Sequence, residues 1–286
     1  MPRVWPPERI IILNNPSVQR SAALADEIYA FLAAMPGLSA SRATIADAAQ
    51  NDCLAGQDMA VVLGGDGSML ATGSLAARHA VPLLGINLGR LGFLGEVQPD
   101  DWREALGQVL AGNGWLEERM MLHVEHRRGG QLLGSYEALN EAVVGRGATA
   151  RPVRLKTLID GGELTTYVAD GLIVSTPTGS TAYALAVGGP ILPPELRNIL
   201  LIAIAPHLSI DRAIVLPQGA TVEVIVRTDH EAILSNDGAR QVALADGDTV
   251  AVRMSDSTTC FVRVRPRHYF YTSLVQRMQQ NPSADK

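Results

Sequence analysis

The sequence is poor in cysteine, because its 286 residues include only Cys53 and Cys260. The two lie far apart and lack CxxC spacing, so neither a disulfide framework nor a cysteine zinc site is expected, and a reducing cytoplasm is the predicted location. Long apolar runs are also missing, since none approaches the ~18 residues that suggest a membrane span. The polar run PPER at residues 6–9 interrupts the start of the chain, where a signal peptide would have its apolar core. We therefore expect no membrane partner.

An excess of basic residues is likewise absent. The chain has 24 Lys and Arg against 29 Asp and Glu, which gives a net charge of −5. This balance argues against general nucleic-acid binding, which requires a basic surface, so any anionic ligand must be held by local groups. The hydrophobic content of 47% is sufficient for a core, and the length suits about two domains of ordinary size.

The glycine-rich stretch VVLGGDGSML at residues 61–70 is the clearest candidate for a ligand loop. The three apolar residues 61–63 indicate the end of a buried strand, and the run that Ser68 opens has apolar residues at helical spacing. Glycines let the backbone approach a ligand closely, and the free N–H groups at a helix start attract phosphate. We interpret Gly64, Gly65, Gly67 and Ser68 as a loop that binds phosphate.

Asp66 lies inside this loop, where a carboxylate would repel phosphate unless it binds a metal ion or accepts a proton. The simpler interpretation is a hairpin turn, for which Asp-Gly is the strongest short signal. A hairpin needs a second strand directly after it, whereas a helical pattern follows here. Asp160-Gly161 and Asp246-Gly247 stand between strand-like runs and are predicted to be plain hairpins. The pattern therefore favours a functional Asp66.

Apolar strands alternate with helical patterns in the first part of the chain, which indicates a parallel sheet. We predict an α/β N-terminal domain with a Rossmann-like sheet over residues 1–115. Ligands of such sheets bind at the carboxyl ends of strands. The glycines at 64–67 and the glycine-rich run 85–95 both follow strands, so both are candidates to line one crevice. The other interpretation of the second run is a mobile glycine connection.

The pattern changes beyond residue 115, where short strand-like runs are separated by turn signals. This predicts an all-β, sandwich-like C-terminal domain over residues 116–268. A final helical pattern at 269–286 is predicted to pack back on the first domain. The predicted strands are 121–125, 134–142, 153–159, 165–168, 172–175, 200–205, 222–227, 250–254 and 261–265.

Two groups of polar residues stand out in the β-rich domain. Asn140-Glu141 joins an amide to a carboxylate and can offer donors and acceptors to a sugar and a base, although an ordinary polar pair at a strand end explains it equally simply. The run STPTGST at 175–181 precedes a helical pattern and predicts a second polar cradle at a helix N-terminus. Tyr183 offers an aromatic face to a base. The GxSxG spacing of a hydrolase nucleophile is absent here.

Taken together, these motifs resemble the bacterial NAD kinases. The resemblance rests on GGDGSML at 64–70, LNE at 139–141 and DGLIVSTPTGSTAYALAVGGPI at 170–191, and INLGRLGFL at 86–94 also fits. It covers nearly the whole chain and thins before residue 60 and after residue 240. Lipid kinases and phosphofructokinases carry loops similar to GGDG, whereas the Asn-Glu pair and the STPTGSTAY block are specific together.

The resemblance implies phosphorylation of the 2′-hydroxyl of NAD's adenosine ribose by ATP. It implies a divalent metal ion, Mg²⁺, bound mainly through ATP, with no protein ligand assigned, and a homotetramer or homodimer in which a neighbouring subunit completes the dinucleotide site. Asp66 is the catalytic residue in this pattern. The implied dinucleotide contacts are Asp66, Gly67, Asn140, Glu141, Arg151, Asp170, Thr178, Thr181, Ala182, Tyr183, Ala184, Leu185, Ala186 and Gln241.

Three of these positions need comment. Ala186 replaces a serine that is common in the family. Relatives have a glutamine contact after the Asp-Gly pair, and it is assigned to Gln241 because Ala239 and Arg240 come first after Asp237-Gly238. Arg151 is also explained as a solvated surface arginine.

There are two alternatives: within enzymes, a lipid or sugar kinase that shares the GGDG loop, and from another class, a non-catalytic dinucleotide sensor. The first leaves 139–141 and 175–183 unexplained, and the second has no need of Asp66. The sequence has no Walker-type GxxxxGK[ST] motif, so no loop lysine holds ATP. Backbone amides of residues 64–68 and the metal ion must then perform that task, which fits phosphoryl transfer because the reaction needs mostly positioning and charge neutralisation.

Overall fold

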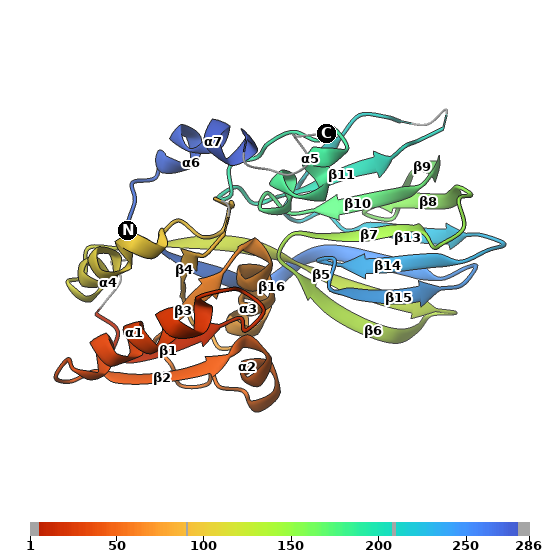
Figure 1. The fold of residues 1–286 in the computed structure, drawn as a ribbon. Helices are drawn as coiled ribbons and strands as arrows, with labels where there is room; N and C mark the ends of the chain where they lie inside the picture. Colours follow the sequence, from red (N-terminus) through yellow and green to blue (C-terminus); the bar gives the residue numbers. More distant parts are fainter. Residues whose placement is uncertain (1–5, 90, 208–209, 280–286) are drawn as a thin grey trace. The chain divides into compact units, whose positions relative to one another are not determined.

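The computed structural model describes residues 6–89, 91–207 and 210–279. The chain divides into two units, one made of the residues up to Glu118 and from Thr259 onward, the other of Arg119–Thr258 (Figure 1). The divisions fall inside two long strands, β5 (Trp115–Arg128) and β16 (Thr249–Arg263). The predicted boundaries at 115 and 268 differ from them because a continuous strand gives no break in the local sequence pattern.

The first unit is built on a parallel sheet with the strand order β2-β1-β3-β4. The end of β16 lies next to β4, with Phe261 opposite Leu83. Every residue of β3 is buried, as expected for a strand covered on both faces. The predicted parallel α/β architecture is confirmed. The strands are β1 (Arg9–Asn14), β2 (Ser39–Thr44), β3 (Met59–Gly64) and β4 (Leu83–Asn87).

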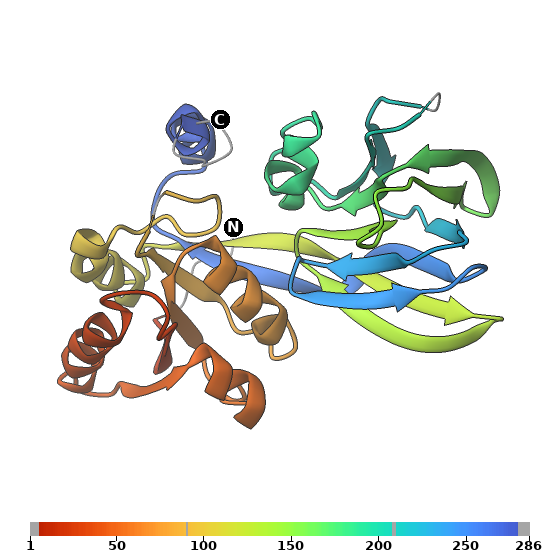
Figure 2. The same ribbon diagram turned by 45° about the vertical axis from the view of Figure 1, so that its right-hand side comes forward.

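Helices cover both faces of this sheet (Figure 2). The apolar faces of α1 and α4 pack in one cluster with Ile10, Ile12 and Leu63. On the other face, Met69 of α3 lies against Gly85 of β4, which leaves no room there for a Cβ. The helices are α1 (Ser21–Ala33), α2 (Ile45–Asn51), α3 (Asp66–Ala77) and α4 (Trp102–Leu110), with a 3₁₀ turn at Pro99–Asp101 before α4.

The second unit holds two antiparallel sheets. One has the strand order β12-β11-β10-β7-β14-β15, and in the other β16, β13, β8 and β9 are neighbours, with β5 paired to β16 and β6. The strands are β6 (Gln131–Ala138), β7 (Glu141–Arg146), β8 (Val153–Ile159), β9 (Gly162–Ala169), β10 (Gly171–Ser175), β11 (Asn198–Ile204), β12 (Ile214–Pro217), β13 (Val222–Arg227), β14 (Ala232–Asn236) and β15 (Arg240–Leu244).

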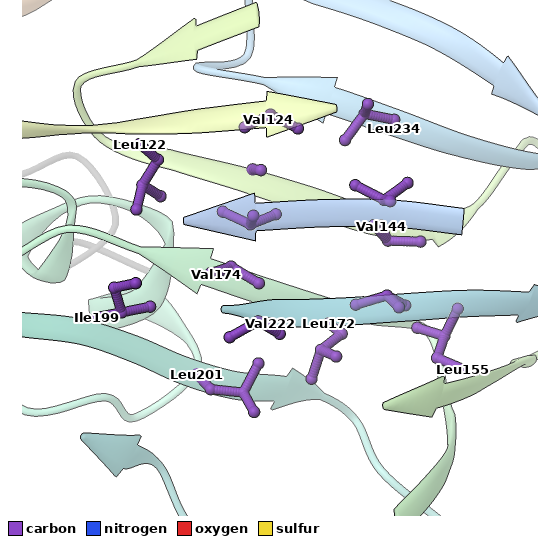
Figure 3. Packing of buried hydrophobic residues seen from close by; sticks show 14 of the residues in the cluster. Leu122, Val124, Val144, Leu155, Leu172, Val174, Ile199, Leu201, Val222 and Leu234 are labelled. Carbon is purple, nitrogen blue, oxygen red and sulfur yellow. The ribbon is translucent and has the colours of Figure 1, made fainter. Parts of the chain in front are cut away.

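The core of the second unit is made of aliphatic side chains from both sheets (Figure 3). Val144, Leu172 and Leu234 come from one sheet, and Leu155 and Val222 come from the other. All five are fully buried. Strands that alternate inward apolar and outward polar residues pack in this way, so the predicted sandwich is confirmed.

One of the two predicted hairpins is correct. Asp160-Gly161 joins the paired strands β8 and β9 with φ values of 51° and 79°, as a tight hairpin requires. Asp246-Gly247 is not a hairpin, because β15 pairs with β14 while β16 pairs with β13, so this turn carries the chain from one sheet to the other. The local sequence of a turn does not specify which strands its flanks will pair with.

The chain ends in two short helices, α6 (Tyr269–Thr272) and α7 (Leu274–Gln279), which belong to the first unit. Residues 280–286 of the predicted final helix lie outside the described part of the chain. Within the described residues, the structure contains no helix of the length and apolar character needed to cross a membrane.

Candidate functional site

The glycine loop of the first unit has the predicted form of a strand, a turn and a helix start. Strand β3 ends at Gly64, and α3 begins at Asp66 after Gly65. A Cβ at Gly64 would collide with the side chain of Ser68, so the loop requires glycine at this position. Asn15, which follows β1, donates from Nδ2 to Ser68 Oγ over 3.2 Å. The carboxyl ends of two neighbouring parallel strands therefore meet at this loop, as expected for a ligand site.

The carboxylate of Asp66 is held by the second glycine-rich run. Phe93 N–H donates to Asp66 Oδ2 over 2.7 Å, and Leu94 N–H donates to Asp66 Oδ1 over 3.0 Å. A Cβ at Gly92 would collide with the same carboxylate. The two loops thus line one place, as the first interpretation of the run 85–95 predicted. Each carboxylate oxygen can accept a further hydrogen bond, so Asp66 is an oriented acceptor at a helix N-terminus.

In the second unit, a half-buried aspartate that sequence reasoning missed fixes the Asn140-Glu141 corner. The carboxylate of Asp237 accepts from the N–H groups of Leu139, Asn140 and Glu141 over 2.8, 2.9 and 3.0 Å. Asp237 N–H returns a bond to the carbonyl of Glu141 over 3.0 Å. The available signal was the Asp237-Gly238 pair, which forms the hairpin between β14 and β15 with φ values of 50° and 67°. The sequence gives no sign of the contact 97 residues away.

The STPTGST run holds the same corner from its carbonyl side. Thr176 donates its N–H to the Asn140 carbonyl over 2.8 Å and its hydroxyl to the Leu139 carbonyl over 2.6 Å. Gly179 lies so close to the Asn140 carbonyl that a Cβ would collide with it. The structure therefore brings these two groups of residues together.

The helix predicted to follow the second polar cradle is much shorter than expected. The helix that follows, α5 (Tyr183–Ala186), is a single turn after a 3₁₀ turn at Gly179–Thr181. The hydroxyls of the run instead satisfy carbonyls of the protein, since Ser180 donates to Pro177 over 2.6 Å and Thr181 donates to Thr178 over 3.1 Å. These hydrogen bonds fix the shape of the loop.

A pocket of about 530 Å³ opens on this unit beside the corner. Three predicted residues line it, namely Glu141, Asp170 and Tyr183. Arg146, which sequence reasoning missed, also lines it and pairs with Asp170 over 3.0 Å. The remaining lining residues are Val143, Gly145, Ile204, Ile233, Ser235 and Gly238. An apolar floor with a few convergent polar groups is typical of a small-molecule site.

Other predicted contacts of this unit have different surroundings. Arg151 is 63% exposed and lies 3.5 Å from Asp229, which is the arrangement of a solvated surface pair. Gln241 is an exposed residue of β15 opposite Ser235. Of the remaining predicted contacts, Thr178, Thr181 and Ala184 are buried, Asn140, Ala182 and Leu185 are half-buried, and Ala186 is exposed.

Glu141 is buried and Asp237 is half-buried, and their carboxyl groups have different hydrogen-bond partners. Burial, and after it the charge of Asp237, raises the pKa of Glu141 to about 8. Glu141 Oε2 is buried without a hydrogen-bond partner among the described residues, whereas Asp237 accepts from three N–H groups. Burial raises the pKa of Asp237 too, but these three donors oppose that shift, whereas Glu141 has no such donors. With a pKa of about 8, Glu141 is the carboxyl group that is protonated at neutral pH. Glu141 therefore presents a hydrogen-bond donor at the pocket.

Replacing Glu141 with glutamine is expected to remove a pH-dependent cost of folding. A pKa raised above its unfolded value adds stability below pH 4.5, and this contribution is lost as the pH rises through about 8. Between pH 5.5 and 8.5 the wild type should therefore lose about 3 kcal/mol of unfolding free energy relative to the variant. Urea unfolding at both pH values measures this difference.

Glu163→Gln is the matched control, since Glu163 is exposed on β9 beside Lys156. We expect no comparable change with pH for this variant. Equal pH dependence of the wild type and Glu141→Gln would show that Glu141 ionises normally.

The class of protein follows from these two units. An oriented carboxylate in a glycine loop at a helix N-terminus, together with a separate small-molecule pocket, defines a nucleotide-dependent phosphotransferase. Two family models match the chain, the ATP-NAD kinase N-terminal domain over residues 35–113 and the ATP-NAD kinase C-terminal domain over residues 139–264. The chain belongs to the NAD kinase family, and it is an enzyme that phosphorylates NAD with ATP.

Curated relatives agree over most of the chain. An NAD kinase of Chloroflexus aurantiacus is 40% identical over 275 residues, which are 96% of this chain and 99% of the relative. The NAD kinase of Heliobacterium modesticaldum is 45% identical over 224 residues, 78% of this chain and 79% of the relative. The predicted resemblance is confirmed.

Solved structures share the fold. Yeast NADH kinase complexed with NADH covers 97% of this chain and 89% of its own, with a TM-score of 0.87 and 24% identity. An NAD kinase from Archaeoglobus fulgidus in complex with ATP covers 96% of this chain and 100% of its own, with a TM-score of 0.71 and 25% identity.

Proposed function

We propose that this chain transfers the γ-phosphoryl group of ATP to the 2′-hydroxyl of the adenosine ribose of NAD, with Asp66 as the base. The observation that carries the proposal is the carboxylate of Asp66, which the N–H groups of Phe93 and Leu94 orient at the start of α3. Phosphoryl transfer needs one group that orients or deprotonates the nucleophile, and an oriented carboxylate can accept the ribose proton.

We assign the phosphates of ATP to Gly64, Gly65, Gly67 and Ser68. This assignment is supported by the helix N-terminus at this loop, because its N–H groups and helix dipole favour anions. The dinucleotide is assigned to the pocket lined by Glu141, Asp170 and Tyr183. There the protonated Glu141 donates a hydrogen bond, and Tyr183 offers a flat face to a ring.

A divalent metal ion, Mg²⁺, is part of the proposal. Within the described residues, no three His, Cys, Asp or Glu side chains come together in a way that would hold a metal ion. Asp66 offers one carboxylate, which suits Mg²⁺ because this ion usually keeps its waters and binds substrate phosphates with only one or two protein carboxylates. The ion would arrive with ATP and neutralise phosphate charge.

We further propose a cytoplasmic homo-oligomer, either a homotetramer or a homodimer, that binds neither nucleic acid nor a membrane. The location is supported by the cysteine content, since Cys53 and Cys260 form no disulfide bond, which fits a reducing compartment. Light scattering on an active preparation tests the assembly, and a monomer mass would contradict it.

The activity itself is tested with purified protein, NAD, ATP and Mg²⁺, with NADP detected by a dehydrogenase that accepts only NADP. We expect NADP to form with NAD as acceptor and no transfer to diacylglycerol, sphingosine or sugars. Transfer to a lipid or sugar in place of NAD would favour a kinase that shares only the glycine loop. Binding of NAD without NADP formation, at saturating ATP and with several divalent metals, would favour the sensor.

A further inference from the structure

The peptide groups that hold Asp66 are themselves bound by two arginines of the C-terminal segment. Arg263 donates from Nη1 to the Leu94 carbonyl over 2.7 Å, and Arg277 donates from Nη1 to the Phe93 carbonyl over 3.2 Å. The carbonyl of Phe93 and the N–H of Leu94 belong to the same peptide group. One planar amide therefore has the Arg277 guanidinium at its oxygen and the Asp66 carboxylate at its N–H.

The charge of Arg263 is compensated by acidic side chains, and these contacts give Arg263 a structural role. Its Nε and Nη2 lie 2.7 and 2.6 Å from Glu117 Oε2, and Glu96 lies 4.0 Å away. All three side chains are buried. Such a buried ion pair fastens the end of β16 to the start of β5 within the first unit, so the role of Arg263 needs no reference to a reaction.

Arg277 is buried with far less compensation. Only 5% of the residue is exposed, its Nε has no hydrogen-bond partner, and no ion pair is found for it among the described residues. Its guanidinium lies 5.5 Å from the ring centres of Phe93 and Tyr269, which gives a modest cation–π attraction. Burial, followed by the charge of Arg263, lowers the pKa of Arg277.

A buried cation with so few partners lowers the stability of the fold, whereas an apolar side chain in its place would not. Buried charges that lack partners in this way occur chiefly at functional sites. The charge that faces Arg277 across the amide is that of Asp66. A donor at the carbonyl oxygen polarises the amide and strengthens its N–H as a donor, because hydrogen bonds in a chain reinforce one another.

We propose that Arg277 of α7 is a positioning residue for Asp66, acting through the Phe93–Leu94 peptide group. This inference rests on the proposed role of Asp66 as the base. The guanidinium fixes the plane and the polarity of the amide, and the amide fixes Asp66 Oδ1. The C-terminal helix thereby belongs to the catalytic apparatus, although Arg277 touches no reacting atom.

The test compares Arg277→Met, which removes the charge and the donor, with Arg277→Lys, which keeps the charge. We expect Arg277→Met to lower kcat by about 10–100-fold, because small displacements of a catalytic group have effects of this size. The KM values for NAD and ATP should stay within about threefold, since the change acts on the reacting geometry and not on ground-state binding. Arg277→Lys should recover part of kcat.

Arg267→Met is the matched control, because Arg267 is an arginine of the same segment that stacks on Trp115 at 4.2 Å. Its kcat should remain near that of the wild type. The double variant distinguishes a positioning role from a merely structural one. If Arg277 acts through Asp66, adding Arg277→Met to Asp66→Asn should cause little further loss of kcat, since the effects of groups that act as a unit are non-additive.

Unchanged kcat in Arg277→Met, or an equal loss in the Asp66→Asn background, would overturn the inference. If Arg277→Met does not fold, the comparison passes to Arg277→Lys and Arg277→Gln, and equal kcat in these two would overturn it as well. An inactive wild type would instead refute the proposed function itself.

Discussion

Asp66→Asn is expected to lower turnover by about 10²–10⁴-fold, the usual range for loss of a general base and equivalent to roughly 3–5 kcal/mol of barrier. The asparagine keeps the shape of the side chain but cannot accept the ribose proton. Its amide group would also face one of the two N–H donors that now hold the carboxylate. Folding should be nearly unaffected, with a loss of about 1 kcal/mol for one hydrogen bond.

The control is Asp160→Asn, at an Asp-Gly pair that forms a plain hairpin. Asp160 also accepts a backbone N–H, from Thr221 over 2.8 Å, so both substitutions disturb a similar bond. Turnover and melting temperature are measured for both variants side by side. If Asp66→Asn retains most of its turnover, or Asp160→Asn is equally inactive while folded, Asp66 is not the base. If high Mg²⁺ restores the turnover of Asp66→Asn, weakened metal binding is the cause of the lost turnover.

Gly92→Ala is expected to lower turnover by about 10²-fold, the effect that a misplacement of ~1 Å has on a catalytic group. The added methyl group would overlap the carboxylate of Asp66, so either the carboxylate or the loop must move. The backbone at Gly92 is not in the left-handed region, and no strain adds to this effect. The measurement is kcat together with the KM for NAD and ATP.

Gly89→Ala provides a control in the same run of glycines. The nearest atom to a Cβ at Gly89 is Asn87 Oδ1 at 3.9 Å, so the methyl group fits. Its kcat should stay close to that of the wild type. Equal activity of the two variants would show that the position of the Asp66 carboxylate does not limit the reaction.

The architecture of both units was predictable where strands and helices have a strong local pattern. The buried strand β3 and helix α3 are of this kind. Edge elements were missed, as at residues 39–51, where β2 is half exposed along its length and has no apolar run. The short strands β12, β14 and β15 were also missed, because four or five residues give too little periodicity to separate them from loops.

The candidate site was predictable only as a set of separate motifs. The chemistry of Asp66 follows from its place in the glycine loop, and its contact with the run 85–95 follows from the meeting of strand ends. The residues that orient the motifs were not predictable. Asp237 binds a corner 97 residues earlier in the sequence, and Arg277 binds a carbonyl 184 residues away. Such bonds depend on tertiary structure and leave no periodic signal.

The hydroxyl-rich run 175–181 shows that a clear local pattern can be compatible with two different structures. Small and hydroxyl-bearing residues before a helical pattern indicate a polar cradle at a helix N-terminus, but the same residue types also satisfy carbonyls in a tight loop. The helix length decides between these structures, and Gly188 and Gly189 follow the single turn of α5 too closely for a longer helix. The family resemblance identified this run correctly as part of the NAD kinase pattern, for reasons that local chemistry did not supply.

The most direct measurement of the central claim is the position of the transferred phosphate. Wild-type protein is incubated with NAD and ATP labelled in the γ-phosphoryl group, and the dinucleotide product is analysed by ³¹P NMR and mass spectrometry. We predict that the label is found on the 2′-oxygen of the adenosine ribose, and that Asp66→Asn yields the same product far more slowly. Label at the 3′-oxygen, or consumption of ATP without a labelled dinucleotide, would contradict the assignment.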